Sequence, residues 1–174
     1  MSGHSSLNTK RIALNGILGA LAVVSVFLAT VLPTNRLSFY ALSSFFVSIV
    51  VVEYGIKNGW AFYVSTFLLA LIIVPDKMEV IPYAVFFGIY GIVKSYIERL
   101  NRIVLEYVLK YLYFNTCVAC AVFLIREVFL ESLRINLSLW LIIIALQGIF
   151  LVYDYVYTLF IRYYINRLKK ILLR

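Results

Sequence analysis

Six polar side chains interrupt the long apolar runs of this sequence and are its best candidates for chemistry. They are Asn15, Glu106, Lys110, Asn115, Gln147 and Asp154. If these runs cross a membrane, each polar group costs a few kcal/mol at the bilayer centre and usually has a partner or a task. Counted inward from Ile125 and Leu137, Asn115 and Gln147 lie about 15 Å deep, and Lys110 and Asp154 lie about 22–26 Å deep.

Matching depth on antiparallel neighbours would let Lys110 pair with Asp154, and Asn115 with Gln147. Gln147 and Asp154 share a helix face because they are seven residues apart, whereas Lys110 and Asn115 point about 140° apart. Both pairs are therefore not expected to form well across one contact. We predict the Lys110–Asp154 ion pair, because an unpaired charge costs more than an unpaired amide. Glu106, four residues before Lys110, is the alternative partner.

Residues for hydrolytic, metal or nucleotide chemistry are not grouped in this sequence. The single histidine, His4, lies in a polar tail, so no Ser-His-Asp triad or Cys/His zinc site can be assembled within the apolar runs. No phosphate-binding Gly-x-x-x-x-Gly-Lys motif occurs. Cys117 and Cys120 have Cys-x-x-Cys spacing but lie inside an apolar run. This position indicates that they are small packing residues and not a redox pair. We expect no enzyme activity, no metal and no cofactor.

The composition indicates which solvent these residues meet. Of 174 residues, 64% are hydrophobic and 14% are charged, and the mean hydropathy is +0.97. Soluble domains have about 45–50% apolar and about 25% charged residues, so the chain is predicted to be an all-α integral membrane protein. The 16 basic residues against 8 acidic ones would suggest nucleic acid in a soluble protein, but here they indicate topology and contact with anionic membrane lipids. No nucleic-acid partner is expected.

Short polar breaks divide the chain into six apolar segments. The breaks include Pro33-Thr34-Asn35-Arg36, Gly55 with Lys57-Asn58-Gly59, and Pro75-Asp76-Lys77. We predict a single membrane domain over 1–174, with spans at about 12–32, 37–52, 60–74, 78–93, 103–125 and 137–161 and a basic tail at 162–174. The second to fourth segments have about 15–16 apolar residues, fewer than the roughly 20 that cross a bilayer, so snorkelling or local thinning would have to help.

The basic residues segregate when they are assigned to alternate sides of six spans. Twelve fall on the side of both termini, and four, Arg36, Lys77, Arg126 and Arg134, fall on the other. Since positive residues favour cytoplasmic loops, we predict a compact six-helix bundle in the cell membrane with both termini cytoplasmic.

Residues of both charge signs gather on the other side, in the loops around 34–36, 76–79 and 126–134. One interpretation is a wetted surface with local ion pairs. The other is the mouth of an outward-opening pocket, with aromatic walls and a glutamine as polar anchor beneath it. For that pocket we predict the small-molecule-binding residues Asn35, Arg36, Asp76, Lys77, Tyr83, Arg126, Trp140 and Gln147.

Three stretches between Lys10 and Arg126 carry a family resemblance. They are the basic start and small-residue segment Lys10-Arg11-Ile12-Ala13-Leu14-Asn15-Gly16-Ile17-Leu18-Gly19-Ala20-Leu21-Ala22, the turn Glu53-Tyr54-Gly55-Ile56-Lys57-Asn58-Gly59, and Tyr83-Ala84-Val85-Phe86-Phe87-Gly88. In these, the chain resembles the substrate-binding S components of energy-coupling factor transporters, compact six-helix membrane proteins that capture vitamins and related micronutrients.

The resemblance implies docking on a transmembrane coupling subunit, with two ATPase subunits driving release. In that family an Ala-x-x-x-Ala motif on helix one docks on the coupling subunit, and the matching positions here are Gly16 and Ala20. With Ala13 and Gly19 they form a strip of small residues that another backbone can approach closely. No vitamin-specific motif occurs, so the substrate stays open. The alternative is a non-transporting scaffold resembling the rod-shape-determining membrane protein of cell-wall assembly.

Overall fold

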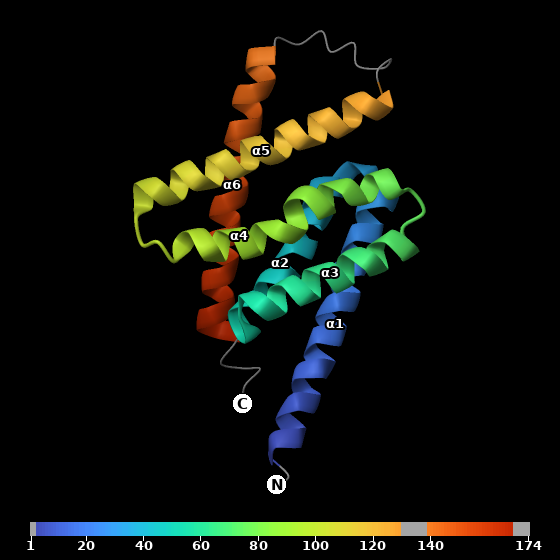
Figure 1. Ribbon diagram of the computed structural model, residues 1–174, viewed down its shortest axis with the longest axis vertical. Coiled ribbons are helices and arrows are strands. Elements are labelled where there is room, and N and C mark those ends of the chain that lie inside the picture. The colour runs from blue at the N-terminus through green and yellow to red at the C-terminus, as the bar shows by residue number, and fades with distance from the viewer. Residues whose placement is uncertain (1–2, 130–138, 169–174) are drawn as a thin grey trace. The chain divides into compact units, whose positions relative to one another are not determined.

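A computed structural model describes residues 3–129 and 139–168 of the chain, and this part is helical with short connections. Six α-helices follow one another (Figure 1). They are α1 (Gly3–Val31), α2 (Arg36–Tyr54), α3 (Ile56–Ile73), α4 (Gly88–Glu98), α5 (Ile103–Phe129) and α6 (Leu139–Tyr163). Two 3₁₀ segments, η1 (Pro33–Asn35) and η2 (Lys77–Val80), and two π-helical segments, η3 (Tyr83–Phe87) and η4 (Tyr164–Leu168), complete the described chain.

Six helical segments of the described chain are long and apolar enough to cross a membrane, which confirms the predicted all-α class and span number. Their bounds are Arg11–Val31, Arg36–Tyr54, Ile56–Ile73, Lys77–Glu98, Ile103–Ala121 and Ile143–Arg167. The fourth is helical throughout, since residues 81–82 join η2 to η3 as α-helix and α4 follows directly. Residues 137–138 of the last predicted span lie outside the described residues.

The middle spans are longer than the apolar runs suggested, with 19, 18 and 22 residues. Gly55 explains the difference at the second break. Its φ of 83° is a conformation that glycine adopts at little cost, so α2 ends and α3 begins within a single residue. Lys57, Asn58 and Gly59 therefore lie in the first turn of α3, and the prediction that they form a loop was wrong. The polar residues lengthen the helix instead of interrupting it.

The chain divides into two compact units, residues 1–96 and 97–174, and each is described by itself. In the first unit α1, α2 and α3 pack against one another, and η2 and η3 contact these helices. Small side chains allow the close approach, since Ser43, Ser44 and Ser48 of α2 are buried. Ser43 donates a hydrogen bond to the carbonyl of Tyr40 at 2.6 Å, which satisfies a buried hydroxyl group within its own helix.

The second unit is built from α5, α6 and η4, and aromatic rings join its two long helices. Phe114 of α5 stacks on Phe150 of α6 with ring centroids 4.4 Å apart, and Tyr111 meets the same ring edge-on at 5.3 Å. A single membrane domain for the whole chain stays a prediction.

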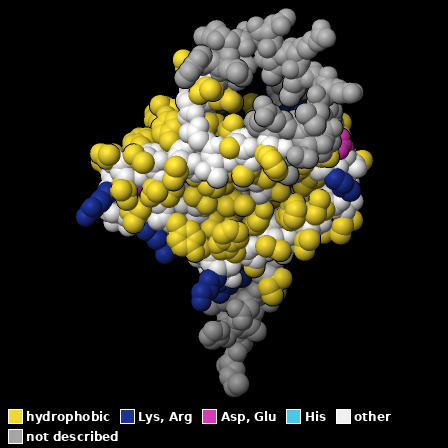
Figure 2. Space-filling view, turned by 45° about the horizontal axis from the view of Figure 1, so that its top comes forward, with side chains coloured by type: hydrophobic (Ala, Val, Ile, Leu, Met, Phe, Trp, Pro, Cys, Tyr) yellow, Lys and Arg dark blue, Asp and Glu magenta, His cyan; other side chains and the backbone are white. Residues whose placement is uncertain are grey.

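Large apolar side chains are exposed along the described helices. Ile12, Ile72, Ile103 and Val104 are each more than 70% exposed, and hydrophobic side chains cover much of the surface shown in Figure 2, with Lys and Arg toward its margins. Such surface is unusual for a soluble monomer and is what a lipid-exposed helix presents.

Candidate functional site

A cavity of about 610 Å³ lies in the first unit where α2 begins. It includes two of the predicted ligand residues, Asn35 and Arg36. The lining residues come from η1, the start of α2, η2 and the region of η3, and they are Thr34, Asn35, Arg36, Leu37, Ser38, Tyr40, Glu79, Pro82 and Phe87. We call this the end cavity.

An ion pair and a buried tyrosine form the polar side of the end cavity. Arg36 Nη1 lies 2.6 Å from Glu79 Oε1, with both side chains partly exposed. The Tyr40 hydroxyl donates to the backbone oxygen of Glu79 and lies 3.3 Å from its Oε2. The Tyr40 ring stacks on Phe87 with centroids 5.4 Å apart. The cavity thus offers a charged pair and a flat aromatic wall to the same occupant.

Asp76 and Lys77, also predicted to bind the ligand, are engaged within their own loop. Asp76 Oδ1 accepts a hydrogen bond from the Met78 backbone N–H at 2.9 Å and so caps η2. Lys77 Nζ donates a 2.6 Å hydrogen bond to the carbonyl of Val74. Val74 directly follows the last turn of α3, so the lysine caps this helix end. Glu79, which the sequence analysis did not select, occupies the position beside Arg36 instead.

Tyr83, predicted as a pocket wall, is completely buried. Its hydroxyl lies 2.7 Å from Thr66 Oγ1 of α3, and its ring packs at 6.1 Å from that of Tyr63. Tyr83 therefore ties η3 to α3 inside the first unit and is not among the residues that line the end cavity.

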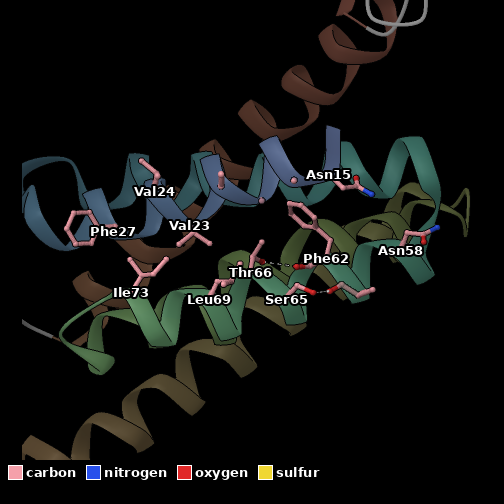
Figure 3. Close-up of a pocket in the computed structure, with 14 residues that line it drawn as sticks. Asn15, Val23, Val24, Phe27, Asn58, Phe62, Ser65, Thr66, Leu69 and Ile73 are labelled. Carbon is pink, nitrogen blue, oxygen red and sulfur yellow. Dashed lines mark hydrogen bonds between the residues drawn. The ribbon is translucent and has the colours of Figure 1, made fainter. Parts of the chain in front are cut away.

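A second hollow in the first unit is an open groove of about 700 Å³ between α1 and α3. Figure 3 shows Val23 and Phe27 of α1 beside Leu69 and Ile73 of α3, with Asn15 and Asn58 at the opposite end. Apolar atoms make most of its wall, and the Oδ1 atom of Asn15 is buried without a hydrogen-bond partner in the described chain. We call this the lateral groove.

Three of the four predicted docking residues line the lateral groove: Gly16, Gly19 and Ala20. Gly19 faces α3, since a Cβ atom built there would lie 3.6 Å from the Phe62 ring and 3.7 Å from Thr66 Cγ2. Gly16 differs, because a Cβ atom there would meet no neighbouring atom of the described residues within 4 Å. Gly16 and Ala20 are exposed, as is Ala13, the fourth predicted residue.

In the second unit the structure brings Lys110 and Asp154 together. Lys110 Nζ lies 3.2 Å from Asp154 Oδ2, and both side chains are buried. A second carboxylate, Glu98 Oε1, lies 3.0 Å from the same ammonium group. Glu98 was not among the predicted partners of Lys110, because it lies at the end of α4, outside the predicted spans.

The amide pair forms as well: Gln147 Nε2 donates to Asn115 Oδ1 at 2.8 Å. The expectation that only one of the two pairs forms well was therefore wrong. The four-carbon stem of Lys110 gives its ammonium group a long reach, so its helix face need not point directly at Asp154. Gln147 Oε1 remains without a hydrogen-bond partner in the described chain.

Within the described part of the chain, the remaining predicted residues do not line the end cavity. The side chains of Arg126 and Trp140 lie outside the described residues, and Gln147 belongs to the second unit. Cys117 is buried and Cys120 is exposed, and neither is in a disulfide. Within the described residues, no three His, Cys, Asp or Glu side chains are grouped as metal ligands would be.

No protein-family model matches the chain, and no curated protein and no solved structure matches it either.

Proposed function

We propose that this chain is the small-molecule-binding membrane subunit of an ATP-driven uptake system and that it docks through α1 on a transmembrane coupling subunit. The observation that carries the proposal is the open side of the lateral groove at Gly16 and Ala20. If Gly16 served packing inside this unit, neighbouring atoms would occupy the space of a missing side chain. Among the described residues, no neighbouring atom lies within 4 Å of a Cβ atom built at Gly16, so the small residues leave room for another chain.

A transmembrane helix is the occupant that suits the lateral groove. The groove runs from Asn15 to Phe27 on α1, about 18 Å at 1.5 Å per residue. Helices in lipid associate through close van der Waals fit, for which Gly and Ala four residues apart provide a flat surface. The partner helix would be a part of the coupling subunit, as the resemblance to energy-coupling factor S components implies.

The end cavity is the proposed ligand site. Arg36 and Glu79 can form charged hydrogen bonds to a polar ligand, and the Tyr40 and Phe87 rings can contact a flat apolar part of it. The class of ligand is thus a small molecule with a polar end and a planar apolar body. In this proposal the end cavity opens outward and both termini are cytoplasmic. The orientation rests on the basic residues, because twelve of them fall on the side of the termini and four on the other.

Energy for uptake would come from the partner subunits, because the sequence has no phosphate-binding motif of its own. The alternative, a membrane scaffold of cell-wall assembly, would also use the lateral groove for a partner helix but would not retain a ligand in the end cavity. The end cavity therefore distinguishes the two functions.

Docking is tested with the double substitution Gly16→Leu and Ala20→Leu. We expect the variant to fold, because the space beside Gly16 is open, but to lose both its co-purifying coupling and ATPase subunits and the uptake activity. Ala145→Leu with Gly148→Leu is the matched control, since both residues are exposed on α6 and a Cβ at Gly148 also meets nothing within 4 Å. Uptake that persists in the folded Gly16→Leu, Ala20→Leu variant would refute docking through α1.

Ligand capture is tested by native mass spectrometry of the gently purified protein. A retained small molecule that is lost in Arg36→Ala and in Tyr40→Phe, but kept in Arg102→Ala, would support the end cavity as its site. Purification without any bound small molecule, together with cell-wall assembly proteins as the only partners, would favour the scaffold.

A further inference from the structure

A third cavity, of about 250 Å³, lies between α5 and α6 in the second unit, and the proposed function does not use it. The lining residues with polar groups are Tyr107, Lys110, Tyr111, Asp154, Tyr155, Thr158 and Arg162. The cavity lies toward the ends of these helices that the basic-residue distribution assigns to the cytoplasmic leaflet.

Arg162 is a hydrogen-bond donor in the lining of this cavity that has no partner among the described residues. Its side chain is exposed, and it has no hydrogen bond or ion pair with any described residue. A guanidinium group carries five N–H donors in a planar fork that matches the oxygens of a phosphate. The hydroxyl of Tyr155 also has no hydrogen bond within the described chain, so a second donor lines the same space.

The acidic residue of the cavity, Asp154, forms its ion pair with Lys110 and has none with Arg162. Asp154 Oδ2 lies 3.2 Å from Lys110 Nζ, and Glu98 Oε1 lies 3.0 Å from the same nitrogen. Thr158 Oγ1 donates to the backbone oxygen of Asp154 at 2.8 Å. Both carboxylates thus contact Lys110, and Arg162 has no ion pair with either of them, so its guanidinium group can donate to an anion that enters the cavity.

We infer that this cavity binds the phosphate of an anionic phospholipid. The apolar part of the lining favours a lipid over free phosphate. Leu151 and Leu159 line the cavity, and because both are about half exposed they can contact an acyl chain. Val152, one residue further along α6, is 60% exposed and continues this apolar surface. A phosphate at Arg162 would place acyl chains along these side chains, with the tyrosines at headgroup depth.

The test uses the purified full-length chain in detergent and dioctanoyl phosphatidylglycerol as the probe. Binding is measured by native mass spectrometry and by thermal stabilisation, with dioctanoyl phosphatidylcholine and inorganic phosphate as comparison probes. We expect Arg162→Gln to lower the affinity for phosphatidylglycerol about tenfold, the factor for one lost charge-assisted hydrogen bond. Tyr155→Phe should lower it less, and Arg162→Lys should keep part of it.

Arg167→Gln is the matched control, because Arg167 is exposed in η4, also lacks a partner among the described residues, and is not part of the cavity lining. An equal loss in Arg167→Gln would refute the site and indicate general surface charge. Equal affinity for phosphatidylcholine, or displacement by inorganic phosphate at similar concentration, would refute the anionic lipid. If Arg162→Gln does not fold, unchanged affinity in both Tyr155→Phe and Arg162→Lys would refute it as well. None of these outcomes bears on the lateral groove or the end cavity.

Discussion

The hydroxyl of Tyr63 in α3 donates a 2.7 Å hydrogen bond to the backbone oxygen of Ala84 in η3. The bond fits the π-helical geometry of this segment. Gly88 N–H bonds to the carbonyl of Tyr83, one residue further back than in an α-helix, where Ala84 would be its acceptor. Tyr63 thus takes the place of a helix donor for a carbonyl that the π-turn releases.

Tyr63→Phe should destabilise the first unit without changing its shape. The ring remains, but the oxygen of Ala84 loses its donor in an apolar surrounding, which costs about 1–3 kcal/mol. Unfolding by titration with a denaturing detergent, followed by circular dichroism, measures the change. Tyr96→Phe is the control because Tyr96 is 51% exposed, and equal stability of the two variants would contradict the role of the Tyr63 bond.

Gly88→Ala should be more harmful than an alanine substitution at most helical glycines. A Cβ atom at position 88 would lie 2.5 Å from the Tyr63 ring and 2.9 Å from the backbone oxygen of Tyr83. Relief of this overlap requires a shift of η3, for which we expect a loss of about 1–3 kcal/mol. Gly16→Ala, with nothing within 4 Å, should be neutral or gain up to about 1 kcal/mol from helix propensity. The same denaturing-detergent titration compares the two, and a Gly88→Ala variant as stable as Gly16→Ala would contradict the close packing.

Apolar run length predicts the number of spans in this chain, but the boundaries depend on backbone conformation. Gly55 with its φ of 83° allows α3 to begin at Ile56, and a sequence pattern does not reveal that a single residue is enough for the turn. The π-turn at η3 is likewise invisible in the sequence, because it depends on the register between Tyr63 and Ala84 across two helices.

In the candidate sites, the depth of a residue along its helix could be predicted from the sequence, but the direction of its side chain could not. Depth along antiparallel helices brings Lys110 to Asp154, and it is computable from the sequence. Which loop residue meets Arg36 depends on side-chain direction, so Asp76 turns to its own helix end while Glu79 forms the ion pair. Asp76 and Glu79 lie in one short segment, and the sequence does not show which of the two carboxylates pairs with Arg36.

The proposed orientation predicts opposite accessibility for positions 35 and 100. In a Cys117→Ala, Cys120→Ala background, Asn35→Cys should react with an impermeant maleimide added to intact cells, and Leu100→Cys should react only after the membrane is opened. Leu100 is preferable to its neighbour Asn101, whose φ of 49° would strain a cysteine. Labelling of both positions from the same side would overturn the topology.

The ion-pair cluster of the second unit predicts unequal effects of its members on stability. Lys110→Met leaves the carboxylates of Glu98 and Asp154 without their shared cation, and loss of one partner of a buried pair costs about 3–5 kcal/mol. Asp154→Leu should cost less, since Lys110 keeps Glu98 at 3.0 Å, whose side chain is 37% exposed and partly solvated.

The double variant Lys110→Met, Asp154→Leu decides whether the two residues are coupled. It removes the cation together with the more buried carboxylate, so its stability should exceed that of Lys110→Met alone. The free energies of unfolding from denaturing-detergent titrations of the four proteins form a double-mutant cycle, for which we expect a coupling of at least about 1 kcal/mol. Lys57→Met serves as control, because Lys57 is exposed at the start of α3. Additive effects at positions 110 and 154 would mean that the 3.2 Å contact does not stabilise the packing of α5 on α6.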